Sequence, residues 1–159
     1  MVDNTLSPHG GVLVERVASP DEAAQMIHGL TRLPVREQIS RECVNIAYGF
    51  FSPLVGFMGQ ADVDSVVRDM TLASGYVWSI PIVLDVSQEQ LTALGVEVGD
   101  TVLLTHQDQP LAVLQVEEIF SYDKEFMAAQ VYGTTDLAHP GVLRTHSLED
   151  SFVDRKSVG

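Results

Sequence analysis

The residue types that most often carry chemistry are sparse in this sequence, and their spacing suits neither metal binding nor catalysis. The five histidines are His9, His28, His106, His139 and His146. No two of them stand three or four residues apart, the interval that places two ligands on one face of a helix. We therefore expect no metal site and no other bound cofactor.

Nucleophile motifs are also missing. The single cysteine, Cys43, allows no intrachain disulfide and no thiolate zinc cluster, and we interpret it as a small buried hydrophobe on a helix. Ser52 precedes Pro53 in a loop and has no Gly-x-Ser-x-Gly elbow, so its hydroxyl is expected to bind a nearby amide. Glu117 and Glu118 lie on a predicted strand, where neighbours point to opposite faces and cannot share a proton. No catalytic and no cofactor-binding residue is predicted.

Length and charge limit the class of protein. A chain of 159 residues fits one domain, and 22 acidic against nine basic residues give a net charge of −13. Such a surface repels phosphate backbones, so a nucleic-acid partner is disfavoured. No apolar run approaches the ~20 residues that cross a bilayer, and the first residues lack the features of a signal peptide. We expect no membrane association and a cytoplasmic location.

The periodicity predicts a mixture of short helices and strands. Helices are expected from Ser19-Pro20-Asp21-Glu22 to Leu30, over 40–47, over 62–70, from Ser87 to Gly95 and over 123–131. A turn at Gly10-Gly11 is expected to lead into a short strand over 12–14, and further strands are expected over 79–86, 101–106 and 111–122, with a hairpin turn at 107–110 and a further turn at His139-Pro140-Gly141. The predicted fold class is α+β, a small mixed β-barrel decorated with short helices.

Residues 48–58 interrupt this pattern. The segment is aromatic and apolar but contains Gly49, Pro53 and Gly56, which no regular element tolerates together. We interpret it as a buried irregular loop.

Three segments together resemble one family. These are Tyr48-Gly49-Phe50-Phe51-Ser52-Pro53-Leu54-Val55-Gly56-Phe57-Met58, then Met70-Thr71-Leu72 with Gly75 and Trp78-Ser79-Ile80-Pro81-Ile82, and finally Val131-Tyr132-Gly133-Thr134-Thr135-Asp136 with His139-Pro140-Gly141-Val142. Their order and gaps resemble the N-terminal, PUA-like domain of ATP sulfurylase (sulfate adenylyltransferase). The opening Pro8-His9-Gly10-Gly11 is similar as well, so the resemblance covers residues 6–143.

The resemblance implies a PUA-like barrel packed against a nucleotide-binding α/β domain. Residues 1–143 would form that barrel, and 144–159 would be a polar tail, either disordered or replacing a closing strand. The candidate residues for packing against a catalytic domain or another subunit belong to the aromatic loop: Phe50, Phe51, Ser52, Pro53, Leu54, Gly56, Phe57 and Met58. The alternative, that these residues only fill the core of the barrel, stays open.

The family's catalytic signature has no counterpart here. It consists of a Gln-x-Arg-Asn-Pro segment and paired histidines, whereas this sequence contains no Arg-Asn pair and no His-x-x-His. The resemblance therefore implies a non-catalytic domain or fragment, inactive alone, that serves stability, assembly or docking. Its partner would be the catalytic domain, in the same chain or a separate one, or a second copy. The alternative is a stand-alone PUA-like binding or scaffolding module.

Overall fold

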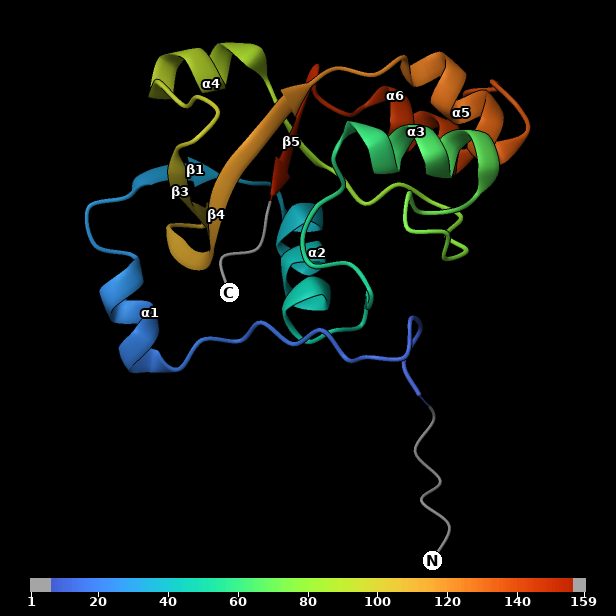
Figure 1. Cartoon of the computed structure of the whole chain (residues 1–159). Coiled ribbons are helices and arrows are strands. Elements are labelled where there is room, and N and C mark those ends of the chain that lie inside the picture. Colours follow the sequence, from blue (N-terminus) through green and yellow to red (C-terminus); the bar gives the residue numbers. More distant parts are fainter. Residues whose placement is uncertain (1–6, 156–159) are drawn as a thin grey trace, which may run out of the picture.

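The computed structural model describes residues 7–155 and contains six helices and five strands in that range. In chain order they are α1 (Pro20–Met26), β1 (Thr31–Pro34), α2 (Glu37–Ala47), α3 (Gln60–Asp69), β2 (Leu84–Val86), α4 (Gln88–Leu94), β3 (Thr101–His106), β4 (Gln109–Phe120), α5 (Lys124–Tyr132), α6 (Pro140–His146) and β5 (Ser151–Arg155). Figure 1 shows α3, α5 and α6 grouped on one side of the molecule, with α2 lying beside the strands.

Local capping chemistry sets several helix ends. The Ser19 amide donates to the Glu22 carboxylate over 2.9 Å while the Ser19 hydroxyl accepts from the Glu22 amide, which confirms the predicted capping box of α1. The helix ends at Met26, four residues before the predicted end. Ser87 caps α4 by accepting from the Gln90 amide, and Gly95 ends that helix in the left-handed conformation with φ 66°.

The predicted hairpin is present between β3 and β4. Its two turn residues, Gln107 and Asp108, have φ of 49° and 63°. Positive φ at both positions belongs to the two-residue turn whose twist matches that of paired strands. β3 agrees with the predicted bounds, and β4 begins and ends two residues earlier than the predicted strand.

The five strands form one sheet in the order β1-β3-β4-β5-β2. β1 runs parallel to β3, and the other pairs are antiparallel. β4 belongs to both halves, because Gln109–Gln115 pairs with β3 whereas Val116–Phe120 pairs with β5. The register shifts between Val116 and Glu118, leaving Glu117 without a paired residue, and such a bulge bends a strand.

The predicted closed barrel is not confirmed. Within residues 7–155, the two edges of the sheet are β1 and β2, which are not paired with each other. Both edge strands are short, with four and three residues, so neither supplies a long ladder for closure. The coarser prediction of a mixed α+β fold is confirmed.

Several local predictions were wrong. The turn at Gly10-Gly11 is present, with the Gly11 amide donating to the Pro8 carbonyl over 2.8 Å, but residues 12–14 form no strand and belong to an extended arm. Of the predicted strand 79–86 only Leu84–Val86 pairs. His139-Pro140-Gly141 is the start of α6 rather than an isolated turn, because the His139 ring accepts from the Gly141 amide as an N-cap. Two strands had not been predicted as such: β1, and β5 in the segment 144–159, where a disordered tail and a replacement strand were both open.

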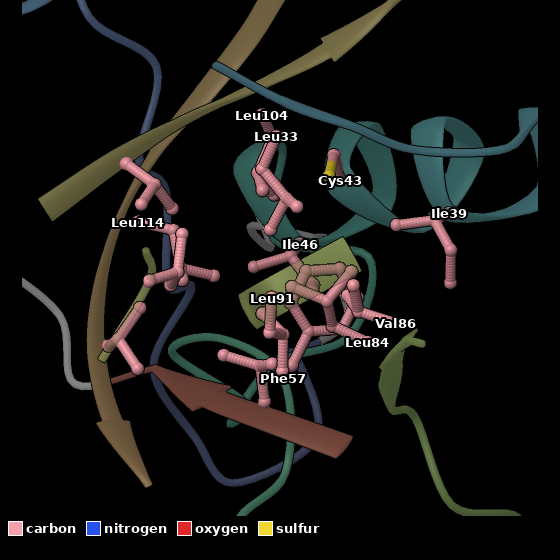
Figure 2. Packing of buried hydrophobic residues seen from close by; sticks show 14 residues of the cluster. Leu33, Ile39, Cys43, Ile46, Phe57, Leu84, Val86, Leu91, Leu104 and Leu114 are labelled. Carbon is pink, nitrogen blue, oxygen red and sulfur yellow. The ribbon is translucent and has the colours of Figure 1, made fainter. Parts of the chain in front are cut away.

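Two apolar clusters fill the interior. The first joins α2 to the strands and contains Leu33, Ile46, Leu84, Leu104 and Leu114 among others, and Figure 2 shows its packing. The second lies between α3, α5 and β5 and includes Val63, Met127 and Phe152. Cys43 is buried in the first cluster, as predicted for a small hydrophobe.

Candidate docking surface and a charged cavity

The aromatic loop at 48–58 forms no helix or strand, as predicted, and most of it faces inward. Ser52, Leu54, Phe57 and Met58 are all buried. Phe57 belongs to the first cluster, whereas Leu54 and Met58 belong to the second. Phe51 packs against both clusters and meets the Trp78 ring edge-on at 6.0 Å. The loop therefore contributes side chains to both clusters and connects them.

Phe50 is the exception among the predicted docking residues. Its side chain is 74% exposed, whereas the neighbouring candidates turn inward or, like Pro53, are half-buried. An exposed phenylalanine next to a buried loop is a candidate anchor for another surface. Of the predicted docking residues, only Phe50 is thus exposed, and the others pack in or against the interior.

Ser52 fixes the loop to an N-terminal arm, residues 7–18. Its hydroxyl donates to the Gly49 carbonyl over 2.7 Å and accepts from the Val14 amide over 2.9 Å. Gly49 has φ 75°, and a Cβ there would stand 2.7 Å from a methyl of Leu13 and 2.8 Å from the Val14 carbonyl oxygen. Only glycine allows this approach. The Ser52 hydroxyl does bind an amide, but not the neighbouring one that was predicted, because the donor is Val14 in the arm.

The arm and the end of α2 together present an exposed apolar surface. The Arg16 amide donates to the Ala47 carbonyl over 2.7 Å, which holds the arm along the last turn of α2 (Figure 1). Six large apolar side chains of these segments are between 47% and 74% exposed: Val12, Leu13, Val17, Val44, Tyr48 and Phe50. We name this set the arm–helix surface. Exposed large apolar side chains on two adjoining segments are candidates for an interaction site.

A buried ion pair ties three segments together. The Asp85 side chain on β2 is 0% exposed, and its carboxylate accepts from the Arg36 guanidinium over 2.8 Å. Its other oxygen accepts from the Glu149 amide over 2.9 Å. The residue before α2, the strand β2 and the turn before β5 are thereby joined by one carboxylate. Sequence reasoning missed this network, because its members are far apart in the chain.

A charged cavity of about 80 Å³ lies next to this ion pair, between α2, residues 80–83, α5 and α6. Arg36, Glu42 and Arg144 are its charged lining residues. Burial raises the pKa of Glu42, whereas hydrogen bonds from Asn45 and Gln38 and the charge of Arg144 act in the opposite direction. Among the described residues the Glu42 Oε2 atom is buried and has no hydrogen-bond partner.

Replacing Glu42 with glutamine is expected to stabilise the protein at about pH 7, by about 1 kcal/mol, because the variant buries no charge. Since the raised pKa means that the folded state binds the proton more tightly than the unfolded state does, wild-type stability increases as pH falls through that pKa. The advantage of the variant should therefore shrink toward about pH 4.5. Urea unfolding at several pH values measures this, with Glu97→Gln on the exposed surface as the control. An unchanged pH profile would contradict the assignment.

Three of the histidines have structural contacts. The His9 ring donates to the Val77 carbonyl over 2.9 Å, and the His106 ring donates to the Val35 carbonyl over the same distance. His139 caps α6. Residues 7–155 bring no three potential metal-ligating side chains together. No helix within this range has the length and apolar character needed to cross a bilayer.

Comparison with known proteins gives one family over nearly the whole chain. The model of the PUA-like domain family matches residues 6–154. The sulfate adenylyltransferase of Hyperthermus butylicus is 40% identical over 141 residues, which are 87% of this chain and 36% of that relative. The sulfate adenylyltransferase of Chloroflexus aurantiacus is 44% identical over 151 residues, which are 94% of this chain and 38% of that relative.

A solved structure agrees with the fold. The hexameric APS kinase from Thiobacillus denitrificans superposes with a TM-score of 0.65 at 26% identity, covering 74% of this chain and 24% of that one. The chain thus spans little more than a third of the curated relatives it matches.

Proposed function

Since this chain belongs to the PUA-like domain family, we propose that it is the non-catalytic, N-terminal PUA-like domain of a sulfate adenylyltransferase and serves stability, assembly or docking. The observation that carries the proposal is the match itself. The chain aligns over 94% of its length with the Chloroflexus aurantiacus enzyme but with only 38% of that enzyme. The whole enzyme would join ATP and sulfate to give adenylyl sulfate and pyrophosphate.

The domain prediction divided the chain at residue 143. The segment beyond it, 144–159, includes β5, which lies between β4 and β2 in the sheet. This position supports the alternative in which the segment supplies a strand of the domain. We accordingly treat residues up to the end of β5 as one unit in the proposal.

The proposal of a docking role rests on the solvent exposure of large apolar side chains. Since Phe51, Leu54, Phe57 and Met58 occupy the two cores, we assign contact with the catalytic domain to Phe50 and the rest of the arm–helix surface. That surface would be covered by a catalytic domain of the same chain or a separate one, or by a second copy. Nucleic acid stays disfavoured as a partner because of the net charge of −13.

A chimera tests this proposal. The segment of the Chloroflexus aurantiacus enzyme that aligns with this chain is replaced by residues 1–159, and pyrophosphate release from ATP and sulfate is measured. We expect an active chimera and background turnover for the isolated chain. Turnover by the isolated chain, or a folded chimera without activity, would contradict the proposal.

The docking surface is tested in the same chimera. Phe50→Asp places a charge in the proposed contact and is expected to weaken domain association and lower activity by about tenfold or more. Val98→Asp is the matched control, because Val98 is 59% exposed and does not belong to the arm–helix surface. Equal behaviour of the two variants would remove Phe50 from the interface.

A further inference from the structure

The charged cavity combines opposite charges with apolar walls. Glu42 and Arg36 approach it from α2 and its N-cap, and Arg144 approaches it from α6. Apolar lining comes from Ile39, Ile82, Met127, Val131 and Leu148. Its volume, about 80 Å³, exceeds the space that one water needs but is far below that of a pocket for a drug-sized ligand. The cavity therefore suits a molecule much smaller than a drug-sized ligand.

Two of the charged groups are only partly satisfied within residues 7–155, although Asn45 and Gln38 donate to the Glu42 carboxylate and the charge of Arg144 acts on it. The Oε2 atom of Glu42 is buried and accepts no hydrogen bond from the described residues. The Arg144 side chain lies on the exposed side, and the described residues offer it no carboxylate within ion-pair distance. Arg36 is different, because Asp85 holds its guanidinium over 2.8 Å and so fixes its position on the wall. Buried polar groups are nearly always satisfied, so the Glu42 oxygen indicates a missing donor.

We propose that this cavity is a binding site for a small zwitterion, a free α-amino acid with a short apolar side chain. Its ammonium group would donate to Glu42 Oε2, and its carboxylate would accept from Arg144 and from the free N–H groups of Arg36. The apolar side chain would lie against Ile39, Ile82 and Val131. Binding involves no covalent step.

Ligands of a single charge fit the lining less well. A simple anion would meet the Arg144 and Arg36 guanidinium groups but would lie close to the Glu42 carboxylate, and like charges at close range repel. A simple cation would satisfy Glu42 but would meet the like charges of Arg36 and Arg144 in the lining. A ligand with a donor and an anionic acceptor can bind both Glu42 Oε2 and the Arg144 guanidinium, and charge-assisted hydrogen bonds of this type are the strong ones.

Calorimetric titration of the 159-residue chain tests the proposal. L-Valine is the probe, isobutylamine lacks only its carboxylate, and isovalerate lacks only its ammonium group. We expect saturable binding of valine that is at least about tenfold tighter than binding of either analogue. No saturable binding of valine would overturn the proposal. Equal binding of isobutylamine would overturn it too and would indicate a basic side chain of a partner instead.

Variants locate the site. Glu42→Gln and Arg144→Gln are each expected to weaken valine binding by about tenfold. Arg41→Gln is the control, because Arg41 lies on the same helix, pairs with Glu37 over 2.5 Å and does not line the cavity. Because Glu42→Gln is expected to be the more stable protein, its loss of binding cannot come from unfolding. Binding that survives both cavity variants would place the ligand elsewhere and overturn the assignment.

This inference does not depend on the proposed function. The titration measures binding to the chain alone, whereas the chimera measures turnover and domain association. If valine binds but the folded chimera is inactive, only the proposed function is contradicted. If the chimera is active but valine does not bind, only the proposed binding site is contradicted.

Discussion

Replacing Phe152 with alanine is expected to lower the free energy of unfolding by about 3–5 kcal/mol, the usual cost of truncating a phenylalanine in a packed core. Phe152 is 1% exposed, belongs to the second cluster and meets the Phe120 ring edge-on at 5.6 Å. It also lies on β5, where its register partners are Phe120 on β4 and Asp85 on β2. Its loss would loosen the core and the central part of one half of the sheet together.

Urea unfolding followed by the fluorescence of the single tryptophan, Trp78, measures this effect. Val98→Ala is the control, since Val98 is 59% exposed and its truncation should change stability by less than about 0.5 kcal/mol. If Phe152→Ala were no more harmful than the control, β5 would not be an integral strand of this domain.

The parts of the fold that could be predicted are those with short-range signals. The Ser19–Glu22 capping box, the Ser87 cap with Gly95, and the hairpin at Gln107 and Asp108 are each contained in a few adjacent residues. Hydrogen bonds within such a segment form wherever the segment is placed, so tertiary context cannot easily override them.

The missed strands depend on long-range partners. β1 is the four-residue segment Thr31–Pro34, of which only Leu33 is buried, so it shows no alternation over a useful length. It forms because β3, which lies far along the sequence, offers a parallel edge. β5 follows a polar stretch, and only the burial of Phe152 and Val153 between β4 and β2 makes it part of the core. Strand propensity is decided by such context more than by local sequence.

The candidate site shows the same division. The glycines and the proline in residues 48–58 identified the aromatic loop in the sequence. They could not show that the loop packs in both apolar clusters or that Phe50 is exposed to solvent. The charged cavity gave no signal in the sequence, because Glu42 and Arg144 become neighbours only when α2 and α6 are in place. An unpaired buried oxygen is a property of packing and not of spacing.

Replacing Asp85 with alanine is expected to cost about 3 kcal/mol, the low end for a broken buried ion pair, because Arg36 is 38% exposed and can regain water. The variant also leaves the Glu149 amide without the acceptor it meets at 2.9 Å. Asp85→Asn should cost less, since the amide oxygen can still accept one hydrogen bond while the charge is lost.

Urea unfolding of both variants, with Asp69→Ala at the exposed end of α3 as the control, separates the possible causes. A loss for Asp85→Ala that Asp85→Asn largely restores would assign the stability to the shape and hydrogen bonds of the carboxylate, and an equal loss would assign it to the charge. If Asp85→Ala matched the control, the network would not hold α2, β2 and the turn before β5 together. Asp85→Ala also removes the carboxylate that holds Arg36 in the wall of the charged cavity, so valine binding is expected to weaken in the same variant that loses stability.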